Sequence, residues 1–165
     1  MPERFTPPNG ASTGGFTEVL LARGATEVWA VDVGHGQLHP RLRDDPRVHA
    51  REGLNVRALT PDDVPPPGLM VADLSFIPLA TALPAALALC PPGARLVALV
   101  KPQFEVGPAA VGKGGIVRDA AAIAGARARV RAFLETSGWT VAGEAESPIL
   151  GGDGNAEFLV TALKR

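Results

Sequence analysis

Residues 10–32 have the sequence GASTGGFTEVLLARGATEVWAVD, in which a glycine-rich turn, a helix and a strand follow one another. The pattern predicts a helix over 16–23, closed by Gly24, and a strand over 27–33 that reaches Asp32. Glycines at a helix start allow a ligand to approach the backbone amides there. The unit therefore predicts an α/β domain that holds a ligand at its first turn.

The alternation of apolar strands and helical segments continues to the end of the chain. In chain order, the further elements expected are a short helix from Gln37, a strand near Val48, a strand over 69–73, a helix from Pro78, a strand over 94–100, a helix over 120–136 and strands over 139–147 and 157–163. This order is typical of a mostly parallel sheet with helices on both faces. The GGDG turn at 151–154 predicts that the last two strands form an antiparallel hairpin.

Two segments do not fit regular elements. The sequence DDVPPPG at 62–68 is expected to be a surface loop, because three successive prolines remove backbone donors and fix φ. The glycine-rich segment 101–117 is too irregular for a helix or strand, and its length predicts a functional loop.

The start of the chain departs from this architecture. A buried strand should precede the first glycine-rich turn, but the sequence FTPPN at 5–9 carries two prolines where a strand needs ladder donors. We therefore expect the first strand to be abnormal or missing.

Composition restricts the class of protein. The chain has 165 residues, of which 46% are apolar and 20% charged, so we expect a single folded domain over 1–165. No apolar run reaches the roughly 20 residues of a membrane span, and the start lacks the plan of a signal peptide. These features predict a cytoplasmic protein without a membrane partner. The single cysteine, Cys90, is expected to be a buried structural thiol.

The charge balance predicts that any contact with nucleic acid is local. The net charge is −1, whereas phosphate binding favours a basic surface. Arginines gather in two regions, and for each a solvated helix or loop face is the favoured interpretation. The two groups are Arg41, Arg43, Arg47, Arg51 and Arg57, and Arg127, Arg129 and Arg131.

Asp32 strengthens the prediction of a ligand at the first turn. An acidic residue that ends the second strand, about 20 residues after a glycine turn, is placed to bind ribose hydroxyls. Alone, the turn would as readily be a simple tight turn, and Asp32 would more often be a cap. The glycine spacing is G-x-x-x-G-G rather than the dinucleotide fingerprint, which disfavours a nicotinamide dehydrogenase.

A second glycine-rich segment, GPAAVGKG at 107–114, resembles a phosphate-binding loop only in part. Gly114 stands where that loop needs Ser or Thr to hold magnesium, and the next helix starts several residues late. A loop that covers a substrate is the favoured interpretation over nucleotide hydrolysis. We predict no metal site.

Three charged residues far apart in the sequence are expected to converge. Asp73 and Lys101 end parallel strands, and Glu157 starts a strand that returns antiparallel, so all three should lie at one edge of the sheet. Open α/β sheets bind ligands at that edge. A lysine near a ribose hydroxyl could stabilise its alkoxide form or, if deprotonated, accept its proton. For any one of the three taken alone, an ordinary surface charge is the favoured interpretation.

Six motifs follow one another along the chain: NGASTGGFT at 9–17, AVDVGHGQL at 30–38, DLSFI at 73–77, LVKPQFE at 99–105, VGKGGIVRD at 111–119 and GNAEF at 154–158. In these motifs the chain resembles the TlyA (hemolysin A) branch of the FtsJ-like ribosomal RNA methyltransferases. The resemblance implies a Rossmann-like methyltransferase fold, S-adenosylmethionine as the methyl donor and a ribose 2′-hydroxyl of ribosomal RNA, at a cytidine, as the acceptor. Ribosomal RNA or a ribosomal subunit is the implied partner, and the oligomeric state is left open.

The resemblance also implies roles for individual residues. The residues that would line the amino-acid end of the cofactor are Gly10, Ser12, Thr13, Gly14, Gly15 and Phe16. Asp32 would hold the cofactor's ribose, and Asn55 and Asp73 would also border the cofactor. The family's Lys-Asp-Lys-Glu catalytic set would supply Asp73, Lys101 and Glu157 here, with Lys101 nearest the reacting hydroxyl.

The sequence departs from the family at its start. Pro8 occupies the position, two before the first motif glycine, where the family has an aspartate. The family's first catalytic lysine and its S4-like RNA-binding domain would lie upstream, so we expect a chain truncated at its amino end. The alternative to an active enzyme is a catalytically impaired remnant that acts as a cofactor- or RNA-binding module.

Overall fold

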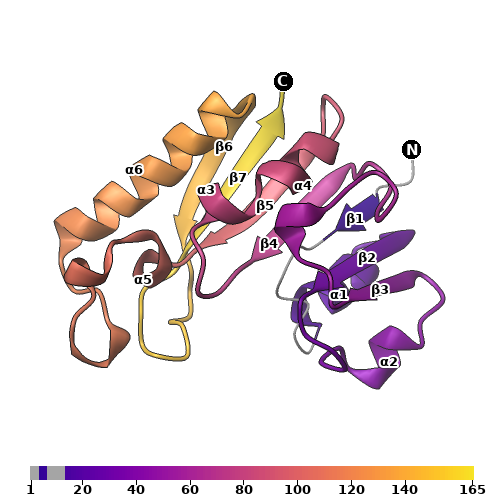
Figure 1. Cartoon of the computed structure of the whole chain (residues 1–165), viewed down its shortest axis with the longest axis horizontal. Helices are drawn as coiled ribbons and strands as arrows, with labels where there is room; N and C mark the ends of the chain where they lie inside the picture. The colour runs from indigo at the N-terminus through magenta and orange to yellow at the C-terminus, as the bar shows by residue number, and fades with distance from the viewer. Residues whose placement is uncertain (1–3, 7–13) are drawn as a thin grey trace.

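The computed structural model describes residues 4–6 and 14–165, which form one seven-stranded sheet with helices on both faces (Figure 1). The strand order is β3-β2-β1-β4-β5-β7-β6. The strands are β1 (Arg4–Thr6), β2 (Glu27–Asp32), β3 (Val48–Glu52), β4 (Leu69–Asp73), β5 (Arg95–Val100), β6 (Trp139–Glu146) and β7 (Phe158–Lys164). The helices are α1 (Gly15–Ala22), α2 (Pro40–Arg43), α3 (Leu79–Ala82), α4 (Pro84–Leu89), α5 (Pro102–Glu105) and α6 (Ala120–Thr136).

The directions of the strands confirm the predicted fold class. The pairs β1–β2, β2–β3, β1–β4 and β4–β5 are parallel, and β7 pairs antiparallel with both β5 and β6. The order 3-2-1-4-5 is that of a Rossmann-like doubly wound sheet, whose ligands bind beyond the carboxyl ends of the strands. The last two strands form the expected hairpin, which adds β7 to the edge of β5.

The first strand exists but is short, so of the two expected alternatives, an abnormal strand or a missing one, the structure shows the abnormal strand. Three residues form β1, which lies in the centre of the sheet and pairs Phe5 with both Val28 and Leu69. Its last residue, Thr6, comes directly before the two prolines, so both prolines follow the strand. The first strand is therefore short rather than absent.

Two groups of apolar residues, one on each face of the sheet, form the core. On one face, α1 covers β2 and β4 through Leu20, Val28 and Val71. On the other face, α3, α4 and α6 cover β4, β5 and β7, and Trp139 is fully buried there. Cys90 is a buried free thiol in this second group, as predicted, and burial raises its pKa to about 11. None of the described helices is long and apolar enough to cross a membrane.

Helix α6 has the predicted bounds because each of its ends carries a clear signal. The Asp119 side chain accepts a hydrogen bond from the Ala121 amide at the start, and Gly138 has a φ of 85° just past the end. Its buried residues Ala126, Val130 and Leu134 are four apart and so lie on one face of the helix.

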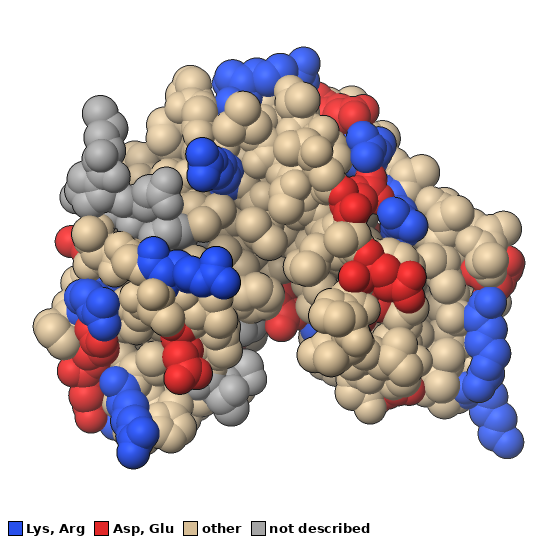
Figure 2. Space-filling view, turned by 180° about the vertical axis from the view of Figure 1, so that it is seen from behind, with Lys and Arg blue, Asp and Glu red and all other residues tan. Residues whose placement is uncertain are grey.

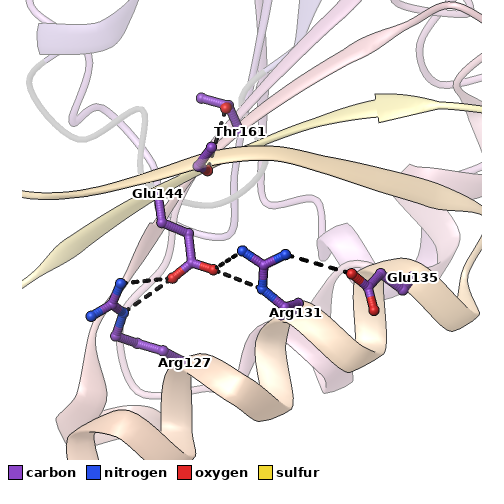
Figure 3. Close-up of polar contacts among 6 residues, drawn as sticks. Arg127, Arg131, Glu135, Glu144 and Thr161 are labelled. Atoms are coloured by element: carbon purple, nitrogen blue, oxygen red, sulfur yellow. Dashed lines mark hydrogen bonds and ion pairs between the residues drawn. The ribbon is translucent and has the colours of Figure 1, made fainter.

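Two of the three arginines of α6, Arg129 and Arg131, are exposed as the sequence favoured, but the arginines also contact neighbouring elements. Arg127 and Arg131 both donate hydrogen bonds to the Glu144 carboxylate on β6, and Arg131 also lies 3.6 Å from Glu135 (Figure 3). Burial alone would raise the pKa of Glu144, but the hydrogen bonds from both arginines outweigh burial and lower it. These two arginines therefore join the helix to the sheet.

The segment 101–117 contains more structure than the sequence predicted. It begins with α5 and continues through two short 3-10 helices, η2 (Pro108–Ala110) and η3 (Lys113–Gly115). Prolines at the first turn of α5 and η2 favour these starts, because their missing amides would have no helical acceptor there. The segment is thus a chain of single turns rather than an irregular loop.

Candidate active site

The carboxyl ends of the parallel strands meet at one edge of the molecule. Figure 2 shows a hollow at its lower edge, the edge toward which the arrows of β4 and β5 point in Figure 1. Acidic and basic side chains are interspersed over the face shown, and no continuous basic patch extends across its described residues. The hollow at the strand ends is therefore the natural place for a ligand.

Lys101 and Asp73 form an ion pair at this edge. The Lys101 Nζ lies 2.7 Å from Asp73 Oδ1, and the two side chains are 14% and 31% exposed. Lys101 also donates a hydrogen bond to the Ser75 hydroxyl at 3.2 Å. Asp73 Oδ1 is shielded from solvent and has no partner with hydrogen-bond geometry, so the pair is held by charge. The strand ends predicted from the sequence thus bring Asp73 and Lys101 into contact.

Glu157 lies close to this pair and is buried. Glu157 comes one residue before the start of β7, and it is 8% exposed. Burial raises the pKa of the Glu157 carboxyl above its ordinary value; the Lys101 ammonium opposes the rise and the Asp73 carboxylate adds to it. The structure therefore places all three predicted residues at the same edge of the sheet, where the charges of Lys101 and Asp73 act on Glu157.

Glu157→Gln is expected to increase the free energy of unfolding at about pH 8 and to change it less at about pH 4. A carboxyl whose pKa is raised by folding contributes stability while it is protonated, and that contribution is lost as pH rises through the folded pKa. The glutamine cannot titrate and so avoids this loss. Urea denaturation of both proteins at the two pH values measures the difference, and a gain that is larger at acid pH would contradict the assignment.

The glycine-rich turn leads directly into α1. Gly14 is buried with a φ of 103°, and a Cβ there would lie 2.2 Å from Leu42 Cδ1, so only glycine fits. Gly15 begins the helix and is exposed, with open space where its Cβ would be, and Phe16 is half-buried against the core. The predicted cofactor residues Gly10, Ser12 and Thr13 lie outside the described residues.

Asp32 ends β2, and Asn55 lies three residues beyond the end of β3. The Asp32 carboxylate accepts a hydrogen bond from the Gly34 amide at 2.8 Å, and its carbonyl accepts one from the Leu54 amide. Asn55 is exposed and its side chain caps the 3-10 helix η1 (Val56–Ala58) through the Arg57 amide. Asp32 therefore ends its strand at the same edge of the sheet as Asp73, and Asn55 follows the neighbouring strand.

Asn155 is a residue of the site that the sequence did not single out. It is 1% exposed, accepts a hydrogen bond from the Val117 amide and donates one to the Gly115 carbonyl. It thus ties the end of the 101–117 segment to the strand start that carries Glu157. Its place in the GNAEF motif gave no indication of this contact.

Phe76 has an unusual backbone conformation. Its φ is 68°, which costs energy for any residue with a large side chain, and it is 89% exposed. The centroid of its ring lies 5.0 Å from the ring centroid of Phe104, a residue of α5. An exposed aromatic side chain therefore comes directly after Ser75, which contacts Lys101.

The segment that resembles a phosphate-binding loop does not adopt that structure. Lys113 lies exposed in η3, and α6 begins at Ala120, after Asp119 has capped it. A phosphate-binding loop leads straight into its helix. The geometry agrees with the preference against nucleotide hydrolysis.

Comparisons with known proteins identify relatives over nearly the whole chain. A profile of the FtsJ-like methyltransferase family matches residues 9–164. The 16S/23S rRNA (cytidine-2′-O)-methyltransferase TlyA of Mycobacterium tuberculosis is 51% identical over 152 residues, which cover 92% of this chain and 57% of TlyA. YqxC of Bacillus subtilis, named as a candidate rRNA methyltransferase, is 47% identical over 92% of this chain and 54% of its own length.

A solved structure shows the same fold at high similarity. The crystal structure of a hemolysin candidate from Lactococcus lactis superposes with a TM-score of 0.95 at 39% identity, covering 99% of this chain and 78% of that chain. This chain spans just over half the length of TlyA and YqxC.

Proposed function

The chain belongs to the FtsJ-like methyltransferase family, and from this premise we propose that it transfers a methyl group from S-adenosylmethionine to a ribose 2′-hydroxyl of ribosomal RNA, at a cytidine. The observation that carries the proposal is the ion pair of Lys101 with Asp73, next to the buried Glu157, at the ligand-binding edge of the sheet. We further propose that 1–165 acts as one methyltransferase domain in the cytoplasm, with ribosomal RNA or a ribosomal subunit as its partner.

The residues beside α1 fit S-adenosylmethionine. Gly14 has no side chain to cover the start of the eight-residue helix α1. The free backbone amides and the positive end of the helix dipole at that start suit the carboxylate of an amino acid. Asp32 ends the neighbouring strand, where a carboxylate accepts hydrogen bonds from ribose hydroxyls. We assign the cofactor to Gly10, Ser12, Thr13, Gly14, Gly15, Phe16, Asp32, Asn55 and Asp73. When bound, it supplies a methyl group on a positively charged sulfur.

Lys101 is assigned to the acceptor hydroxyl. An ammonium has three N–H donors; Lys101 uses one in its hydrogen bond to Ser75 and faces Asp73 through charge. A remaining N–H would hold the ribose 2′-oxygen, and the cofactor would supply the methyl carbon to which that oxygen bonds as the carbon–sulfur bond breaks. The hydroxyl proton passes to solvent if Lys101 stays charged, or to Nζ if Lys101 is neutral.

Two neighbours complete this assignment. Asp73 and Glu157 keep Lys101 oriented by charge, because one contacts Nζ and the other lies buried nearby. Phe76, next to Ser75, offers an exposed ring, and an aromatic face can stack on the base of the target nucleotide.

Methyl transfer to ribosomal RNA tests the proposal directly. The purified chain is incubated with S-adenosylmethionine carrying a labelled methyl group and with ribosomal subunits or extracted ribosomal RNA, and the modified nucleotide is identified after digestion. Label on a cytidine 2′-oxygen supports the proposal. A folded chain that binds S-adenosylmethionine but leaves both RNA substrates unlabelled would favour a binding module instead.

Asp32→Ala is expected to weaken binding of S-adenosylmethionine by at least about tenfold, because a hydrogen bond to a charged group contributes about 1.5–3 kcal/mol. Calorimetric titration of both proteins measures the change. Asp62→Ala is the matched control, since Asp62 is an exposed carboxylate in the loop after η1 and should leave the affinity unchanged. Equal affinities of Asp32→Ala and the unmodified chain would refute the assignment of Asp32 to the cofactor.

A further inference from the structure

The segments that follow β4 and β5 continue side by side beyond the sheet. The strands pair from Leu69↔Arg95 to Asp73↔Leu99, and two side-chain contacts extend the pairing past the last strand residue. Lys101 donates to Ser75, and the Glu105 carboxylate accepts a hydrogen bond from the Leu79 amide at 2.8 Å; each contact joins residues 26 positions apart. The second contact has no part in the chemistry described above.

Glu105 is held in place from two sides. Leu79 is the first residue of α3, and its amide belongs to the group at a helix start that has no acceptor inside the helix. Glu105 Oε1 supplies that acceptor from a different element. On the other side, Arg129 of α6 donates a hydrogen bond from Nη2 to the Glu105 carbonyl at 3.2 Å. Glu105 thus connects α6, α5 and the start of α3.

The segment between the two contacts is strained. Phe76 lies between Ser75 and Leu79 and keeps a positive φ of 68°, a conformation that costs energy and persists only where surrounding contacts impose it. The contacts available are those of Ser75 with Lys101, Phe76 with Phe104, and Leu79 with Glu105. Loss of one of them should let the segment relax.

We propose that Glu105 is a positioning residue for methyl transfer: by accepting the Leu79 amide it fixes the segment 75–79 against the turn that carries Lys101, and so holds Ser75 and Phe76 in place at the acceptor site. This inference rests on the proposed function. Glu105 itself acts through these residues and does not contact the reacting atoms.

The proposed positioning role needs the acceptor oxygen of Glu105 and does not depend on its negative charge. Burial raises the pKa of the Glu105 carboxyl, against the opposing effects of the Leu79 amide and Arg129. A glutamine keeps an oxygen that can accept the Leu79 N–H, whereas an alanine removes it. The pair Glu105→Gln and Glu105→Ala therefore separates the hydrogen bond from the presence of a carboxylate.

Two measurements on the full chain test the proposal, with Glu135→Ala as a control that removes an exposed carboxylate at the far end of α6. Hydrogen exchange reports the Leu79 amide directly. Glu105→Ala should exchange it at least about tenfold faster, while amides of β4 and β5 stay protected and Glu105→Gln retains protection. Methyl transfer should show kcat lower by about tenfold in Glu105→Ala, rescued in Glu105→Gln, with the affinity for S-adenosylmethionine unchanged.

Each failure has a distinct meaning. Unchanged protection of Leu79 in Glu105→Ala would overturn the proposal, as would loss of activity in Glu105→Gln equal to that in Glu105→Ala. Full activity of Glu105→Ala would also overturn it. If the unmodified chain transfers no methyl group to any RNA, the proposed function fails and the positioning role fails with it, even where the exchange result supports the contact between Glu105 and Leu79.

Discussion

Lys101→Ala is expected to lower kcat for methyl transfer to ribosomal RNA by about 1,000-fold while leaving the fold intact. Removing a group that stabilises developing negative charge typically costs about 100- to 1,000-fold, and removing a general base costs about 100- to 10,000-fold. Lys101 contacts Asp73 and Ser75 by its terminal nitrogen alone, so truncation removes the donor at the site. Single-turnover transfer from labelled S-adenosylmethionine measures the change.

A second variant decides how Lys101 acts. Lys101→Arg keeps a permanent positive charge but cannot accept a proton, because the guanidinium stays protonated in proteins. Partial activity would favour stabilisation of the alkoxide, and loss equal to that of the alanine would favour proton transfer to a neutral amine. Arg95→Ala is the control, since Arg95 is exposed at the opposite end of the same strand. Activity of Lys101→Ala close to that of this control would contradict the assignment.

The convergence of the three charges could be predicted because it depends only on where strands end. Buried apolar runs end at Asp73 and just before Lys101, and β7 begins just after Glu157 in the opposite direction. The ends of parallel strands and the start of an antiparallel strand lie at the same edge of a sheet. The meeting point can therefore be predicted once the hydrophobic periodicity and the direction of each strand are right. The predicted bounds of β4 and β5 differ from the structure by at most one residue.

The supporting contacts could not be predicted, because they depend on the paths of loops. The side chains of Ser75 and Glu105 each accept one hydrogen bond, and that of Asn155 forms two, all with residues 26 to 40 positions away. Hydrophobic periodicity says which residues face the core but nothing about which loop passes beside another. Phe76 could not be recognised either, since a positive φ in a phenylalanine arises from contacts around it and not from local preference.

The first strand is abnormal, as expected, but it is short and not missing. Proline removes a ladder donor, and β1 ends at Thr6, directly before the two prolines in the sequence. The structure therefore decides between the two alternatives that the sequence left open. The sheet still forms around a three-residue strand, since β2 and β4 each pair with it and are bound to longer neighbours on their other sides.

Gly151→Ala is expected to lower kcat by about 100-fold with little change in stability. A Cβ at this position would lie 2.5 Å from Glu157 Oε1, too close to coexist with the present carboxylate. The atom in the way is the end of a flexible side chain and the glycine's φ is not positive, so the fold can accept the methyl group by moving Glu157 alone. Displacement of a reacting or orienting group by about 1 Å can cost about 100-fold in rate.

The neighbouring glycine gives the matched control. Gly152→Ala adds the same methyl group in the same turn, but no atom lies within 4 Å of its Cβ, so kcat should stay unchanged. A double-mutant cycle with Glu157→Ala then isolates the mechanism. If Gly151→Ala acts by moving the carboxylate, it should cost almost nothing further once Glu157 is truncated, because the clashing atoms are gone. An undiminished cost in that background would show that the loop, and not Glu157, transmits the effect.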